Sequence, residues 1–373
     1  MTLREFIEEA RPKKLDWYII KKFISTFFVA LLLIIFIVII FDISEKIDDF
    51  VSRQVPLKEI VLDYYVNFVP YFMNMFSPLF VFITVIFFTS RMAANSEIIA
   101  ILSCGISFNR LIRPYLMSAA IIFAFSLSLN LWVIPDANKV RMAFETKYVK
   151  NYDSHEQGLG RNLHYQIAPG EFVYVESFSA WNNTGYKFTL EKIQNNNLVS
   201  KLTASTATWD STKCAWTLKN WFIRDYDASM QNRIRGGRQI DTVLNITIGD
   251  FKKTRDFETQ LNQTELNQYI ATKRMRGDAD IKKALIEKHT RFSMPFSVFI
   301  LTIMGVSLSS RKRRGGIGWN LGLGIGLSFS YILFMRFSNM FVYTDALPPL
   351  LALWLPNIIF AAIAVVLYRL APK

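Results

Sequence analysis

The sequence predicts an α-helical membrane protein with six transmembrane helices and an all-β, jellyroll-like domain between the third helix and the fourth. Hydrophobic residues make up 51% of its 373 residues, and the mean hydropathy of +0.22 exceeds that of ordinary soluble proteins. The apolar residues gather in runs long enough to cross ~30 Å of hydrocarbon. One long polar segment with short alternating stretches, typical of β-strands, separates the third run from the fourth.

The composition also excludes several functions. The net charge of +13 is spread over membrane flanks and a large loop, without the basic, aromatic-rich motif of a nucleic-acid binder. Cys104 and Cys214 are predicted on opposite sides of the membrane and cannot pair. His155, His164 and His289 lack the spacing of metal ligands. No GxxxxGKS or GxxxxGKT run is present to bind ATP. We therefore predict no catalytic set and no metal site, so any energy must come from a partner protein.

The first span is predicted at 23–41, followed by an acidic segment at 42–50. Cations near a span favour the cytoplasmic side, so the N-terminus is expected in the cytoplasm. We expect no cleavable signal sequence, because the run is long and no small-residue cleavage site follows it. The cations that precede the span are Arg11, Lys13, Lys14, Lys21 and Lys22.

The second span is predicted at 66–90 and the third at 111–134, with Pro135 marking the outer end of the third. Together these spans define a first region, 1–134. The second span returns the chain to the cytoplasm, and this places the stretch between the two spans on the cytoplasmic face.

That stretch, 91–113, predicts a short amphipathic helix at about 95–105. Asn95 or Ser96 can cap it, Glu97 suits the positive end of the helix dipole, and Gly105 would end it. Apolar residues recur at i, i+3 and i+4. The helix either closes a loop at the interface or is a coupling helix that enters a cytoplasmic motor protein. The candidate coupling residues are Glu97, Ile98, Ile101, Leu102, Gly105 and Ser107.

The next region, 135–292, lies outside the membrane, periplasmic or extracellular, because the third span exits outward. About seven short strands are predicted at about 160–255, and they suggest a sandwich or an open jelly roll. LVSKLTA and TATW are predicted as two of these strands, and IDTVLNITI as the last. Two connecting helices, 264–276 and 280–291, lead back to the membrane.

The last region, 293–373, carries spans four to six. Four consecutive cations at 311–314 indicate the cytoplasmic side, so both termini are expected there. Gly318, Gly322 and Gly326 recur every four residues in the fifth span, which allows a neighbouring helix to approach closely. This pattern fits tight packing within the bundle or an interface that moves.

Several stretches resemble the YjgP/YjgQ (LptF/LptG) permeases, the membrane subunits of the lipopolysaccharide transport exporter. They are LDWYIIKKF at 15–23, FDISEKIDDF at 41–50 and SEIIAILSCGIS at 96–107. A further pattern runs from Leu266 through Tyr269, Gly277 and Arg291 to Pro295. The resemblance covers nearly the whole chain, and its first two stretches favour the G subunit over the F subunit.

The resemblance implies a function in the inner membrane of a Gram-negative bacterium. An F-type and a G-type permease form a heterodimer over two copies of a cytoplasmic ABC ATPase, which binds ATP and Mg, and this chain holds no cofactor. The pair extracts lipopolysaccharide or lipo-oligosaccharide and passes it to an LptC/LptA-like periplasmic jellyroll protein for delivery to the outer membrane. Glu97 matches the family's coupling-helix glutamate. In the β domain we expect an apolar groove for acyl chains, with inward aromatic side chains such as Phe172 or Tyr174.

The family's phosphate-binding cations are expected near the outer end of the first span, where this chain is mostly acidic. A less phosphorylated lipid A, other cations, or a divalent metal that bridges the charges would each account for the difference. Each candidate cation could also simply extend its charge from the membrane interface into water. The candidates are Lys46, Arg53, Lys58 and Arg336.

Two alternatives stay open. A lipoprotein-extracting permease is one, although such proteins usually carry their soluble domain after the first span. The other is a non-transporting membrane scaffold whose β domain binds a periplasmic partner.

Overall fold

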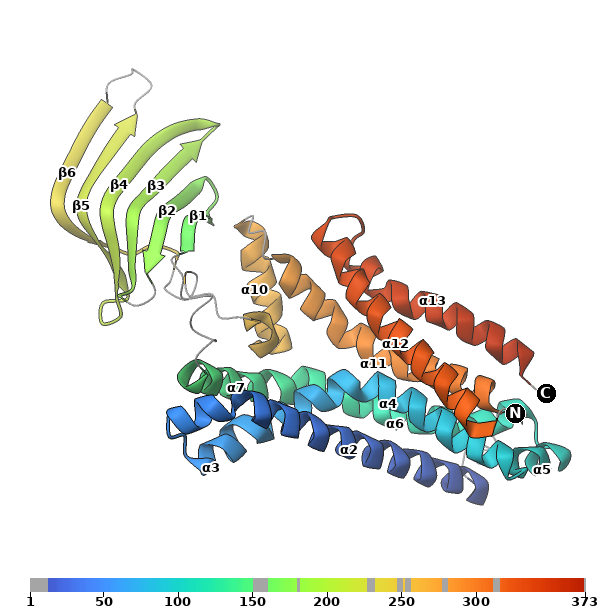
Figure 1. Cartoon of the computed structure of the whole chain (residues 1–373). Coiled ribbons are helices and arrows are strands. Elements are labelled where there is room, and N and C mark those ends of the chain that lie inside the picture. Colours follow the sequence, from blue (N-terminus) through green and yellow to red (C-terminus); the bar gives the residue numbers. More distant parts are fainter. Residues whose placement is uncertain are drawn as a thin grey trace. The chain divides into compact units, whose positions relative to one another are not determined.

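A computed structural model describes residues 13–149, 160–179, 182–226, 232–246, 251, 256–276, 281–310 and 316–371. The predicted cation run at 311–314, His155, Arg11, Gly277 and the start of the second connecting helix lie outside these ranges. The chain forms two compact units, a helical one from Met1–Arg141 with Leu285–Lys373 and a β unit from Met142–Ala284. Figure 1 shows the elements of each.

Six of the described helical segments are long and apolar enough to cross a membrane, as the sequence predicts. Most extend beyond the predicted spans; the first helix, for example, continues past 23–41 at both ends because it contains neither Gly nor Pro. The helical elements are α2 (Lys14–Ser52), α3 (Leu57–Glu59), η1 (Ile60–Tyr65), α4 (Val66–Ala94), α5 (Glu97–Ser103), α6 (Phe108–Ser128), η2 (Leu129–Val133), α7 (Ile134–Tyr148), α11 (Ile281–Ser309), α12 (Gly316–Tyr343) and α13 (Pro349–Leu370).

The helix that contains the third predicted span does not end at Pro135. It continues through α7 to Tyr148. A π-helical stretch, η2, ends two residues before Pro135 in the chain. The wider π turn changes the backbone hydrogen-bonding pattern where the proline ring and its missing N–H would otherwise break the helix.

The second connecting helix and the fourth span are also one helix, α11, rather than two. Pro295 lies inside α11 and leaves the carbonyl of Arg291, four residues earlier, without its helical donor. The Asn130 side chain donates to that carbonyl over 3.4 Å. Asn74 in turn donates to Asn130 over 2.8 Å and accepts from Ser126 over 2.6 Å. Buried amides thus join α4, the third helix and α11.

Two large apolar clusters of the helical unit share the helix α4. One joins α2, α4 and α6 around side chains such as Phe27, Val85 and Tyr115, all fully buried. The other joins α4 to α11, α12 and α13 around Phe82 and Tyr331. Because α4 contributes to both, it is the central helix of this unit.

The β unit contains a six-stranded antiparallel sheet in which every strand pairs with its neighbours in sequence. The strands are β1 (Gly160–Ala168), β2 (Glu171–Ser179), β3 (Thr184–Gln194), β4 (Asn197–Asp210), β5 (Ala215–Tyr226) and β6 (Asn232–Thr242). The sequence prediction of about seven strands exceeds the described sheet by one, because LVSKLTA and TATW lie on the single strand β4. Of the described residues of IDTVLNITI, those at 240–242 belong to β6. Among the described residues the sheet is an open meander, without the crossed connections of a sandwich.

One face of this sheet is apolar and covered. Val173 and Val175 of β2 are each 1% exposed, and Phe251 stacks on Phe178 at 4.7 Å between ring centroids. Phe172 is 39% exposed and Tyr174 is half-buried on the opposite face, so the prediction that they point inward is wrong. Side chains alternate along a strand, and an error of one residue therefore reverses the face. Two further elements of this unit follow the sheet, η3 (Phe257–Gln260) and α10 (Gln263–Met275).

Candidate functional site

The predicted cytoplasmic helix corresponds to α5, which joins α4 to α6 at one end of the helical unit (Figure 1). Ser96 is its N-cap residue, but its side chain makes no capping bond; its φ of 61° turns the chain sharply out of α4. Gly105 has φ +80° and donates its N–H to the carbonyl of Leu102 over 3.0 Å. A residue with a side chain would be strained in this conformation, which explains the glycine at the helix end.

The apolar stripe of α5 faces the bundle. Ile98 is 1% exposed within the cluster of α2, α4 and α6, and Ile101 and Leu102 pack against that cluster. These three side chains therefore attach α5 to the transmembrane helices. The opposite side is exposed and includes Ile99, 51% exposed. Sequence reasoning missed this outer side, although an isoleucine outside the apolar stripe was a signal for it. Its exposed residues are Ile99, Ala100, Ser103 and Cys104.

Glu97 lies half-buried at the start of α5 and is held from two directions. Its carboxylate accepts from the Asn95 amide over 3.2 Å and from the Tyr18 hydroxyl over 3.4 Å. Tyr18, on α2, accepts in turn from the Lys22 ammonium over 2.6 Å. A single carboxylate thus connects α5 to the first transmembrane helix.

A buried ion pair close to α5 in sequence escaped sequence reasoning. Arg110 donates twice to Asp16, over 2.6 Å each, and the Asp16 side chain is 2% exposed. Asp16 also accepts the backbone N–H of Lys13 over 2.7 Å. Ser107 caps α6, since its hydroxyl accepts the N–H of Arg110 over 3.3 Å. The start of α6 is therefore fixed to the start of α2 by a bidentate charged contact.

The predicted phosphate-binding cations fall in two places. Lys46 bonds Asp42 over 2.8 Å and also the hydroxyl of Tyr64. Arg53 follows the end of α2, and Lys58 is exposed on α3, the next element. Arg336 is exposed on α12 instead. Within the described ranges, no three His, Cys, Asp or Glu side chains gather as a metal site.

The glycine stripe of α12 is open. A Cβ built at Gly318, Gly322 or Gly326 meets no atom within 4 Å, whereas one at Gly324 would lie 2.3 Å from Ile86. Tight packing between α12 and α4 therefore uses Gly324. A groove lined by the stripe and by Trp319, Leu323, Leu327 and Ser330 remains on the surface of α12.

Comparison with known families gives one result that covers nearly the whole chain. The model of the family described as "Lipopolysaccharide export system permease LptF/LptG" matches residues 17–370. This range includes α5, the sheet and the glycine stripe. The match does not separate F-type from G-type permeases. A search of curated proteins finds no match. This match agrees with the six helices long and apolar enough to span a membrane and with the sheet between the third and the fourth. The chain belongs to the LptF/LptG family, the permeases of the lipopolysaccharide export system.

Proposed function

We propose that this export permease receives the motion of a cytoplasmic ATPase through α5 and uses it to extract lipopolysaccharide or lipo-oligosaccharide. The observation that carries this proposal is the two-sided character of α5. Its inner side is part of the transmembrane core through Ile98, and its outer side is exposed at Ile99. A short helix built in this way can transmit a push from outside directly to α2, α4 and α6.

The ATPase side of the contact follows from the same geometry. A groove in the ATPase takes the outer side of α5, and a basic side chain there meets Glu97 at its edge. ATP and Mg bind to the two ATPase copies, because permeases of this family are the membrane-spanning and not the catalytic subunits. The Asp16–Arg110 pair supports transmission, since it makes the start of α6 move with α2.

The remaining partners are a related six-span permease and an LptC/LptA-like periplasmic jellyroll protein. The stretches LDWYIIKKF and FDISEKIDDF favour the G-type subunit for this chain, paired with an F-type subunit. The open glycine stripe of α12 supports a contact with a helix of another chain, because backbones approach closely where side chains are small.

The orientation places both termini in the cytoplasm of a Gram-negative bacterium and the β-sheet in the periplasm. The cations before the first span and those at 311–314 support it. At the periplasmic end of the spans, Lys46, Arg53, Lys58 and Arg336 are the candidates for contact with lipid phosphates. The bond from Lys46 to Asp42 already balances part of the charge of Lys46.

Mass spectrometry of the chain purified from a membrane of its source organism tests the proposal. The expected copurifying molecules are an ABC ATPase, one related six-span permease and lipopolysaccharide or lipo-oligosaccharide. A triacylated lipoprotein in place of the glycolipid would support the lipoprotein-extracting alternative. Purification with a periplasmic protein but without any ATPase would instead favour the scaffold.

A further inference from the structure

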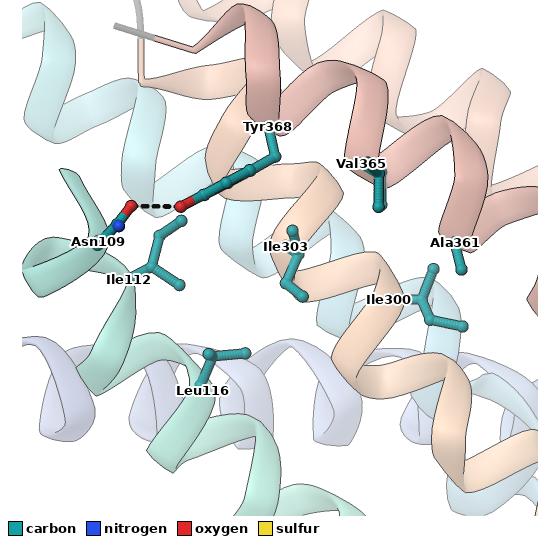
Figure 2. A pocket seen from close by; sticks show the side chains of 9 residues that line it. Asn109, Ile112, Leu116, Ile300, Ile303, Ala361, Val365 and Tyr368 are labelled. Atoms are coloured by element: carbon teal, nitrogen blue, oxygen red, sulfur yellow. Dashed lines mark hydrogen bonds between the residues drawn. The ribbon is translucent and has the colours of Figure 1, made fainter. Parts of the chain in front are cut away.

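A pocket of about 360 Å³ lies between α6, α11 and α13, away from the glycine groove of α12 (Figure 2). Its wall is aliphatic, with Ile112 and Leu116 from α6, Ile300 and Ile303 from α11, and Val365 from α13. Cavities of roughly 300–1,000 Å³ are the usual size for a small-molecule site. Nothing in the transport proposal uses this pocket.

The pocket has one polar end. There the Tyr368 hydroxyl donates to the side-chain oxygen of Asn109, as the dashed line in Figure 2 shows. Asn109 lies in the first turn of α6 and Tyr368 in the last turn of α13. From Asn109 to Leu116 the helix rises about 10 Å, at 1.5 Å per residue. The pocket therefore extends from the helix ends into the apolar part of one leaflet.

Each of the two helices that supply this pair also carries an arginine close to it in sequence. Arg113 is four residues after Asn109 and shares its row on α6, and Arg369 directly follows Tyr368. Both are exposed. The site thus combines an aliphatic chamber with a neutral polar pair at the helix ends. Each of the two helices adds an exposed arginine near that pair, Arg369 next to Tyr368 and Arg113 about one turn deeper than Asn109.

We propose that this pocket binds one acyl chain of an anionic glycerophospholipid, whose phosphate lies against Arg113 and Arg369. Val365 lines the pocket and is 52% exposed, so the pocket opens toward the surrounding bilayer, where acyl chains are the available apolar material. The polar pair matches the ester region of such a lipid, and the arginines match its charge. The site lies at the same end of the bundle as α5. Its assignment to the cytoplasmic leaflet rests on the proposed orientation, whereas lipid binding in the pocket does not depend on that orientation.

The test uses the full chain in nanodiscs of phosphatidylcholine that contain a trace of phosphatidylglycerol with a diazirine in the middle of one acyl chain. After irradiation, the labelled peptides are mapped by mass spectrometry. Labelling is expected to concentrate at 300–303 and 361–365. Ala361→Phe and Val365→Trp both fill the pocket and should reduce that labelling several-fold. Val366→Trp is the matched control, because Val366 is 57% exposed and does not line the pocket.

A second pair of variants tests the charge. Arg113→Gln combined with Arg369→Gln should abolish the preference for phosphatidylglycerol over an equally labelled phosphatidylcholine. Arg91→Gln, an exposed arginine at the end of α4, should preserve it.

Three results would overturn the proposal. Labelling spread evenly over all lipid-facing helices would indicate annular lipid only. Equal labelling by the two lipids in the unmodified chain would remove the role of the arginines. A photoreactive phenylalanine at position 365 that links to a polypeptide in cells would assign the pocket to a partner helix. None of these readouts involves ATP or export, so they are independent of the proposed transport function.

Discussion

At the scale of single residues, neighbouring positions on α5 have opposite environments. Ile98 is buried in the transmembrane core, whereas Ile99, one residue later, is exposed. Successive residues on a helix are about 100° apart, so one step is enough to change the side. Glu97 lies at the border between the two sides and bonds to Tyr18 of α2. The proposed coupling function would therefore divide between residues that attach α5 to the bundle and residues that a partner can reach.

Replacing Glu97 by lysine should weaken binding of the ATPase at least about tenfold, or about 1.4 kcal/mol. The reason is that lysine would place a positive charge against the basic side chain proposed on the ATPase. Copurification of the ATPase with the permease measures the effect, and the melting temperature of the permease should change little. Glu97→Gln serves as the control that removes the charge without reversing it. Unchanged ATPase binding in the lysine variant would remove Glu97 from the contact.

Ile98→Ala and Ile99→Ala should separate attachment from docking. Loss of the buried Ile98 side chain should destabilise the permease by about 2–5 kcal/mol, as for other buried isoleucines. The Ile99→Ala variant should lose at most about 0.5 kcal/mol of stability, because Ile99 is exposed, but its ATP-driven export should fall. Thermal unfolding in detergent and transport in proteoliposomes give the two readouts. The opposite pattern, in which only Ile99→Ala lowers stability, would contradict the inward packing of α5.

At the scale of elements, α12 has two kinds of glycine with different purposes. Gly324 allows α4 to approach, and the stripe at Gly318, Gly322 and Gly326 leaves a surface groove. Glycine costs helix stability, roughly 0.5–1 kcal/mol relative to alanine. Three glycines at open positions are therefore unfavourable for α12 alone, which favours a contact outside this chain.

Gly322→Leu should leave the permease folded and disrupt its association with the related permease. A Cβ at position 322 meets no atom within 4 Å among the described residues, so a side chain there starts in open space and a partner is expected to oppose it. Gly324→Leu is the matched comparison and should impair folding, because its Cβ would collide with Ile86. Expression level, thermal unfolding and copurification of the second permease distinguish the two. An intact heterodimer with Gly322→Leu would move the interface elsewhere.

At the scale of the whole molecule, the chain combines a membrane bundle with a sheet that has one covered apolar face. The partly buried side chains Leu202 and Ile240 pack against the core of that face. Phe172, in contrast, lies on the other face. If lipid passes along the sheet, the apolar face is the surface that matches its acyl chains.

Photoreactive phenylalanine at Leu202 or Ile240 should therefore trap lipopolysaccharide in proteoliposomes that contain ATP and the complete exporter. The same amino acid at Phe172 should trap little, because that position points away. Omission of ATP should reduce the adducts at the inward positions. Equal adducts on both faces would indicate non-specific contact and contradict passage along the covered face.

The sequence by itself determined the class of protein and the place of its parts. Long apolar runs identify membrane helices because hydrocarbon thickness sets their length, and Gly105 marks the end of α5 because only glycine adopts its φ easily. The alternation of apolar and polar residues indicated where the strands lie in the sequence. These features depend on neighbours within a few residues, so local patterns are sufficient to recognise them.

The tertiary structure decided which side of each helix or strand is buried and which distant segment it contacts. Asp16 and Arg110 are 94 residues apart in sequence, and no local pattern predicts that they meet. Packing against distant segments likewise decides that Ile98 is buried and that Phe172 lies on the uncovered face of the sheet. It also decides that Gly324 contacts a neighbouring helix whereas Gly322 does not. Pro135 and Pro295 lie within continuous helices because a π turn and a distant asparagine compensate for the missing N–H. Long-range packing chooses between arrangements that local preferences leave nearly equal in free energy, and for this reason only the folded chain distinguishes them.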